Sequence, residues 1–218
     1  MPTPAALVTE LCEDAGISDA SGSDDRVKAM KCLNRAASEI TSHFRTIKGS
    51  GTLTAGSTSY TLASSVTRAV GLDALLVAGR STPLPRSSYI RVRALQNAGN
   101  TGDPTVYAFE DGTVYTDSAG SSALTALCYL SWSDVNESSA ESAISGIPVD
   151  WHRRLLLPLA TAILLEGWEG EEERAAVKRR VAAEAWAQFG FEQARKGGLD
   201  LAQYAIADFS TPTPLSGR

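Results

Sequence analysis

Hydrophobic residues recur at every third or fourth position between residues 24 and 47, which is the repeat of one face of an α-helix. Charged residues occupy many of the other positions, so we expect a long amphipathic helix with one side buried in a core. Ser23 or Asp24 is suited to cap it, because either side chain can accept hydrogen bonds from unpaired backbone N–H groups of the first turn. The side expected to be buried consists of Val27, Met30, Leu33, Ala37, Ile40, Phe44 and Ile47.

A second helix is predicted over residues 150–167, around eleven residues, 155–165, that carry no charge and no side-chain amide. This run is too short to span a bilayer, so it favours a helix in a protein core. We expect Asp150 to cap the helix and Pro158 to bend it, because proline lacks the N–H that would bond to the carbonyl of Arg154. The core of this helix is expected to contain Leu155, Leu159 and Ile163.

Two further helices flank these. Pro4 fits the first turn of a short helix that Gly16 ends. Residues 172–198 form a last helix with acidic residues near its start, where the helix dipole favours them. The residues expected to face inward on this last helix are Val177, Val181, Ala185, Trp186 and Phe189.

From Gly49 onward the pattern changes to short alternating segments rich in Thr, Ser and β-branched residues, which are typical of half-buried strands. Asp111 and Gly112 separate two such segments and favour a tight hairpin turn, because both positions can adopt positive φ. Ser87 or Ser88 is expected to cap a short helix that extends through Leu95. We expect strands over 51–55, 57–62, 66–77 and 123–132, and a short edge piece over 81–85.

The fold class expected from this order of elements is α+β. We expect a bundle of about four helices from residues 1–48 and 147–196, with residues 49–146 as a β-rich insert containing a small antiparallel sheet. The polar residues 197–218 are expected to form an extended arm that orders on binding. Its hydrophobic anchors are Leu199, Leu201, Tyr204 and Phe209.

Net charge and cysteine spacing narrow the range of functions that the chain can have. The 218-residue chain has 20 Lys and Arg against 25 Asp and Glu, a formal net charge of −5, so any affinity for nucleic acid must be local. Its three cysteines, at positions 12, 32 and 128, fit neither a disulfide framework nor a zinc motif, which favours reduced thiols in a cytosolic product. The N-terminus lacks the basic region of a secretory signal, and no segment qualifies as a membrane span.

Few residues are candidates for catalysis or metal binding, and we expect no enzyme, no cofactor and no metal site. The two histidines, His43 and His152, lie beside hydrophobic stripes, where packing is the simpler explanation. The acids Glu169, Glu171, Glu172 and Glu173 are an alternative as ligands of a divalent cation, but adjacent helical positions point in diverging directions.

The basic residues of the last helix offer a second possibility, a DNA-binding packaging or regulatory module. Lys178, Arg179 and Arg180 are consecutive, however, so they fan around the helix and share no stripe. Residues 150–196 contain eight acids and eight bases, a net charge of zero. If this alternative holds, binding would depend on Arg174, Lys178, Arg179 and Arg180.

The order of features over residues 24–196 resembles the head-to-tail adaptor proteins of tailed bacteriophages, which are also called head-completion or connector proteins. Gly102, Pro104 and Tyr107 match a Gly-x-Pro-x-x-Tyr motif of the family. A second motif, an Ile-Pro pair followed by a histidine, matches at Ile147, Pro148 and His152. Residues 117–122, DSAGSS, depart from the family, whose members often have a proline-containing turn after the hairpin.

The resemblance implies a structural virion protein without catalytic residues. It implies a ring of identical copies, commonly dodecameric, at the neck of the virion below the portal vertex, made in the host bacterial cytoplasm. The partners implied are the portal protein, a tail or stopper protein of the neck, and other copies of the chain. DNA would pass through the channel without sequence-specific binding, and no membrane is involved.

Two orientations of the chain in such a ring are open. In one, the helical bundle forms the lateral contacts, the C-terminal arm reaches the portal and the β-rich insert meets the tail side. In the other, the arm and the insert exchange places. A net negative charge suits a DNA channel, because acidic walls repel phosphates.

Overall fold

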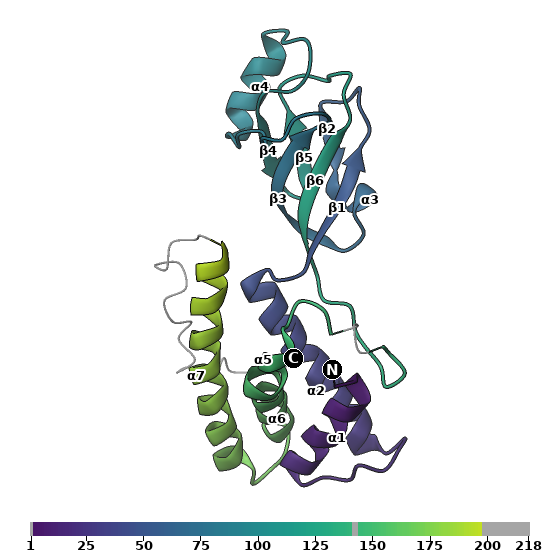
Figure 1. The fold of residues 1–218 in the computed structure, drawn as a ribbon, viewed down its shortest axis with the longest axis vertical. Helices are drawn as coiled ribbons and strands as arrows, with labels where there is room; N and C mark the ends of the chain where they lie inside the picture. Colours follow the sequence, from purple (N-terminus) through teal and green to yellow (C-terminus); the bar gives the residue numbers. More distant parts are fainter. Residues whose placement is uncertain (1, 141–143, 198–218) are drawn as a thin grey trace. The chain divides into compact units, whose positions relative to one another are not determined.

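The computed structural model of the chain describes residues 2–140 and 144–197, with side chains described as far as Arg195 in the last helix. The chain has the α+β composition that the sequence predicts, and it divides into two compact units (Figure 1). The helical unit contains the described parts of residues 1–44 and 133–218, and the β unit contains residues 45–132.

Local capping explains the first two helices. Helix α1 (Pro4–Ala15) begins after Thr3, whose side chain accepts a hydrogen bond from the N–H of Ala6, and it ends at Gly16 with a left-handed φ of 74°. Helix α2 (Asp24–Phe44) begins after Ser23, whose Oγ accepts from the N–H of Arg26 at 3.2 Å. These ends agree with the predicted signals at Pro4, Gly16 and Ser23.

The expected buried side of α2 is partly wrong. Val27 is exposed, and Ile47 lies beyond the helix in the β unit. The buried position near the start of α2 belongs to Arg26, whose Nε donates to Glu137 at 2.7 Å and which also pairs with Asp19. The hydrophobic side of α2 that is buried consists of Ala29, Leu33, Ala36, Ala37, Ile40 and Phe44.

The central helical segment has three parts: α5 (Val149–Trp151), the π-helical turn η2 (His152–Leu156) and α6 (Leu157–Leu165). Asp150 does not cap it, because the helix begins one residue earlier and Pro148 takes the cap position. In the π turn the N–H of Leu157 bonds to the carbonyl of His152, five residues back. This wider turn comes directly before Pro158, which cannot donate a backbone hydrogen bond to Arg154.

Helix α6 is the buried centre of the helical unit. Every residue of it except Pro158 is buried, and it lies against α1, α2 and the last helix α7 (Glu172–Gly197). Leu155, Leu159 and Ile163 are all buried in this region. A helix that is apolar on all sides, as this one is, is stable only when neighbouring helices cover it.

Residues 133–140 belong with the helices and not with the β unit. Asn34 of α2 fixes them through two hydrogen bonds with the backbone of Val135, each 2.9 Å long. The unit boundaries therefore lie after Phe44 and after Trp132, whereas the sequence placed them after residues 48 and 146. The first boundary differs because α2 ends at Phe44, and the second because these long-range hydrogen bonds are not revealed by local periodicity.

The β unit contains two antiparallel three-stranded sheets, ordered β1-β6-β3 and β2-β5-β4, with the short helices α3 and α4 between strands. The Asp111-Gly112 turn is confirmed, with φ of 48° and 74°. The edge piece expected over 81–85 is not a strand, and only Arg86 forms an isolated bridge, with Tyr107. The bounds are β1 (Lys48–Leu53), β2 (Ser59–Thr61), α3 (Leu62–Ser65), β3 (Ala69–Val77), α4 (Tyr89–Asn97), β4 (Tyr107–Glu110), β5 (Thr113–Thr116) and β6 (Leu124–Leu130).

A buried carboxylate organises the loop before β4. Asp117 accepts hydrogen bonds from the N–H of Thr105 at 2.9 Å, from its hydroxyl at 2.6 Å, and from the N–H of Val106 at 3.2 Å. Burial alone would raise the pKa of Asp117, but these hydrogen bonds outweigh it and lower the pKa. The motif containing Gly102, Pro104 and Tyr107 is therefore part of a structural loop.

Candidate interaction surfaces

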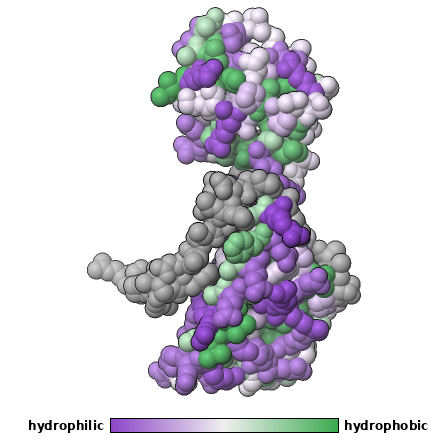
Figure 2. Space-filling view, turned by 60° about the vertical axis from the view of Figure 1, so that its left-hand side comes forward, coloured by the Kyte–Doolittle hydropathy of each residue, from purple (hydrophilic) through white to green (hydrophobic). Residues whose placement is uncertain are grey.

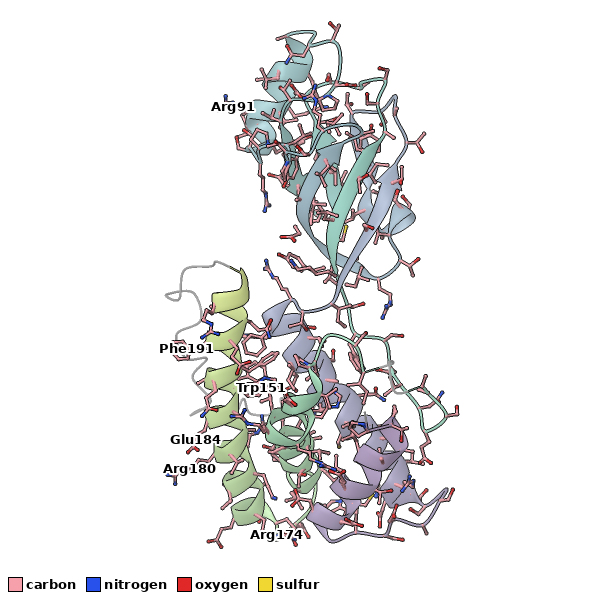
Figure 3. The ribbon with its side chains drawn as sticks, viewed as in Figure 1. Arg91, Trp151, Arg174, Arg180, Glu184 and Phe191 are labelled. Carbon is pink, nitrogen blue, oxygen red and sulfur yellow. The ribbon has the colours of Figure 1, made fainter. Side chains whose placement is uncertain are left out.

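The outer side of α7 exposes three large hydrophobic side chains. Val177, Val181 and Phe191 are 58%, 45% and 62% exposed. At 100° per residue they fall within a sector of about 80°, so they share one side of the helix. Figure 3 shows Arg180, Glu184 and Phe191 projecting from α7 away from the other helices. We call the set Val177, Arg180, Val181, Glu184 and Phe191 the outer face of α7.

Hydrophilic side chains surround these hydrophobic ones. On this side of the helical unit the space-filling view shows separate hydrophobic patches within a largely hydrophilic surface (Figure 2). Arg180 and Glu184 form an i,i+4 ion pair of 3.7 Å on the outer face. Such a surface resembles a protein interface more closely than a plain solvated helix, because solvated helices rarely place several large hydrophobic residues in one stripe.

The prediction that Val177 and Val181 face inward is therefore wrong. The buried side of α7 consists mostly of alanines together with Trp186 and Phe189. Small side chains let α7 approach the fully apolar α6 closely. Because α7 has apolar residues on two sides, periodicity alone does not show which side is buried. The buried residues are Ala175, Ala182, Ala185, Trp186, Phe189 and Ala194.

A cluster of aromatic rings fixes α7 against the rest of the helical unit. The ring of Phe44 lies 4.8 Å from those of both Trp186 and Phe189, and Phe189 lies 5.1 Å from Trp151. His43 packs 5.0 Å from Trp186, and burial lowers its pKa. Packing therefore accounts for His43, and the outer face of α7 is held by a well-anchored helix.

Four basic residues of α7 are neutralised within the helical unit. Lys178 donates to Asp14 at 2.5 Å, and Arg179 makes two hydrogen bonds with Glu166, at 2.6 and 2.9 Å. Arg174 pairs with Glu171 at 2.7 Å. Together with the Arg180–Glu184 pair, these contacts leave each of the four candidate DNA-binding residues with an acidic partner. Polyanion binding would have to compete with those partners.

His152 is buried and inaccessible to a substrate. Its Nε2 lies 2.9 Å from the carbonyl oxygen of Ile147, so Nε2 carries the hydrogen and donates it. Burial lowers the pKa of His152, although the bond to Ile147 opposes this effect. The two preceding residues do not form a site with it, since the side chain of Trp151 is buried while that of Asp150 is exposed. A neutral histidine in such a place serves packing.

The other candidates from the sequence are the possible metal ligands, the cysteines and the arm residues. In the part of the chain that the structure describes, no group of three or more His, Cys, Asp or Glu side chains is arranged to hold a metal ion. Cys12, Cys32 and Cys128 are free thiols. None of the described helices is both long and apolar enough to cross a membrane. The arm residues Leu199, Leu201, Tyr204 and Phe209 lie outside the described residues.

Comparison with known proteins gives no further assignment: no family model matches the sequence, and no curated protein matches it. Function must therefore be inferred from the order of the elements and from the exposed surfaces. Sequence periodicity missed the outer face of α7. Phe191 could have indicated this face from the sequence, because two phenylalanines two residues apart, Phe189 and Phe191, lie on different sides of a helix.

Proposed function

We propose that this chain is a structural virion protein that forms an adaptor ring between the portal and the next neck or tail protein of a tailed bacteriophage. The ring completes the head and continues the DNA channel. The finer architecture proposed is a bundle of about four helices, a β-rich insert, and the extended C-terminal arm of residues 197–218. The support comes from the resemblance in element order and from the outer face of α7.

The observation that carries the proposal is the exposure of Val177, Val181 and Phe191 on one side of a firmly anchored helix. Complete burial of one such side chain contributes about 1.5–3 kcal/mol. These three are about half exposed, so their burial against a neighbour contributes about 3 kcal/mol before the loss of freedom on association. One contact of this size is weak, but a closed ring gives every copy two contacts.

The portal and the neck or tail protein are the proposed partners at the two ends of the ring. The arm, with Leu199, Leu201, Tyr204 and Phe209, is proposed to reach the portal, and the β unit the tail side. The exchanged orientation is the alternative. DNA slides through the channel without sequence-specific binding, for which the net charge of −5 is favourable.

The second candidate, a DNA-binding packaging or regulatory module, has less support. It depends on Arg174, Lys178, Arg179 and Arg180, and each of them pairs with an acidic side chain of the same unit. Strong, salt-dependent DNA binding that is lost on Arg179→Ala and Lys178→Ala would favour this candidate over the adaptor.

A pair of substitutions on α7 tests the adaptor proposal. Val181→Asp places a charge among the exposed hydrophobic side chains of the outer face, whereas Ala176→Asp places the same charge on an exposed position about 140° from Val181 and outside the sector of Val177, Val181 and Phe191. We expect Val181→Asp to reduce ring formation, measured by native mass spectrometry with and without the portal, and Ala176→Asp to have little effect. Equal assembly of the two variants would contradict a lateral contact through this face.

A further inference from the structure

Charge is distributed unequally between the two units. The β unit, residues 45–132, has seven bases and five acids, a net charge of +2. The rest of the chain has thirteen bases and twenty acids, a net charge of −7. Two of the five acids in the β unit are occupied, since Asp117 is buried in its loop and Asp73 pairs with Lys48 at 3.1 Å. The Asp73–Lys48 pair removes one charge of each sign, so the burial of Asp117 is what leaves the surface of the β unit more basic than its composition suggests.

The positive charge is concentrated at and just before helix α4. No acidic residue occurs between Asp73 and Asp103, whereas four arginines do. At 100° per residue, Arg91 and Arg93 flank Ile90 at about 100° on one side and about 60° on the other, so the three cover the exposed half of α4. Together with Arg86, just before the helix, we call them the α4 face. Ser88 fixes the start of α4, because its Oγ accepts from the N–H of Arg91 at 3.4 Å. Figure 3 shows Arg91 projecting away from the β unit.

The side chains of the α4 face have no acidic partner among the described residues. Arg86 donates to the backbone carbonyl of Phe109 at 3.2 Å, and Arg93 donates to Gln96 at 2.9 Å. Arg93 also lies 5.8 Å from the centre of the Tyr89 ring. These contacts orient the arginines without neutralising their charge. Ile90, at the centre of the face, is 80% exposed, more than any other large hydrophobic residue described as exposed.

The same chain presents a surface of opposite charge at the start of α7. Glu172 and Glu173 are exposed there, and no described residue forms an ion pair with them. The neighbouring Glu171, by contrast, forms an ion pair with Arg174. Glu173 and Val177 are four residues apart, so they share one side of α7. The surface thus has exposed carboxylates beside an exposed hydrophobic residue, and the α4 face has exposed guanidinium groups beside Ile90.

We propose that the α4 face of one copy binds the start of α7, Glu172, Glu173 and Val177, on a second copy. Opposite charges meet at the rim and Ile90 is buried against Val177. Because the two surfaces differ, the contact is head-to-tail, the kind of contact that builds a ring of identical copies when the rotation between neighbours closes. The inference rests on the proposed function, because it names the surface that covers the Val177 end of the outer face of α7 in the same ring. DNA is a weaker fit, since a phosphate backbone would leave Ile90 exposed.

Charge reversal on the full-length protein tests the proposal. Arg91→Glu alone places like charges opposite each other, and so does Glu173→Arg alone. We expect each to weaken association of copies by about tenfold or more. The double variant, or an equal mixture of the two single variants, restores opposite charges at every contact and is expected to recover assembly. Association of the unchanged protein should weaken as salt is raised.

The control is Arg68→Glu, which makes the same change of charge at an exposed position of the β unit outside the α4 face. Circular dichroism and thermal unfolding verify that each variant is folded. Assembly is measured by native mass spectrometry with the portal, and DNA affinity with a duplex oligonucleotide of random sequence. If the ring forms normally with Arg91→Glu, or if that variant loses only DNA affinity, the inference fails and the adaptor proposal stands. If the unchanged protein forms no ring, both fail.

Discussion

The ring of Trp186, in α7, lies 4.8 Å from the ring of Phe44, the last residue of α2. This contact joins two helices that are more than a hundred residues apart in the chain, at the point where the β unit begins. Phe189 continues the cluster one turn further along α7. The aromatic residues therefore determine which side of α7 is buried, and the opposite side becomes the outer face.

Loss of an aromatic ring from this cluster should destabilise the helical unit. Phe189 is fully buried and contacts Phe44 and Trp151, so Phe189→Ala is expected to lower the free energy of unfolding by about 3–5 kcal/mol. Phe191→Ala, two residues away and exposed, is expected to change it by about 0.5 kcal/mol or less. Urea unfolding of both variants measures the difference. Equal effects would contradict the assignment of the two sides of α7.

The core position of α6 gives a similar expectation. Leu159→Ala should lower the free energy of unfolding of the helical unit by about 2–5 kcal/mol, because Leu159 is buried where α6 meets its neighbouring helices. The neighbouring Pro158 is only partly buried, and Pro158→Ala is the comparison. A change near zero for Leu159→Ala would show that α6 is not in the core.

Acid should destabilise the β unit through Asp117. Its pKa is lower in the folded state than in the unfolded state, where it is about 3.9. Above pH 4 the stabilisation is fully present, and it is lost as the pH falls below that value through the folded pKa, because the unfolded state binds the proton more readily. Asp117→Asn should be less stable at pH 7 and less sensitive to acid. A variant that unfolds with the original pH dependence would contradict this role.

We expect His152 to make the stability of the helical unit depend on pH, at higher pH values than Asp117 does in the β unit. Burial lowers the pKa of His152, whereas an unfolded histidine titrates near pH 6.5. As the pH falls below about 6.5 the unfolded state binds a proton that the folded state does not, so the free energy of unfolding decreases. Unfolding by urea at pH 7 and pH 5.5 measures the decrease.

Two variants separate the histidines in this experiment. His152→Gln keeps a donor for the carbonyl of Ile147 and should remove much of the pH dependence, whereas His43→Gln should remove less because the side chain of His43 is far more exposed than that of His152. If His152→Gln left the decrease unchanged, His152 would not be its source.

The sequence predicted features that depend on local chemistry. Ser88 caps α4 and the Asp111-Gly112 turn forms because each needs only neighbouring residues. Predictions that depend on distant partners were less accurate. Arg26 replaced Val27 as the buried residue because Glu137, 111 residues away, pairs with it.

The candidate sites follow the same rule. Leu155, Leu159 and Ile163 are apolar in a segment that is apolar on all sides, so their burial needed no knowledge of the partner helices. The outer face of α7 and the α4 face were not recognised, because exposure depends on which side of a helix the rest of the unit covers. The arm residues lie outside the described residues, so their role stays a prediction.

The central claim is that the chain forms a ring on the portal. Its most direct test is the mass of the purified protein, measured alone and after mixing with the portal protein of the same genome. The account predicts a complex of fixed stoichiometry in which copies of the chain form a ring on the portal. A protein that does not bind the portal at about micromolar concentration would contradict the adaptor function.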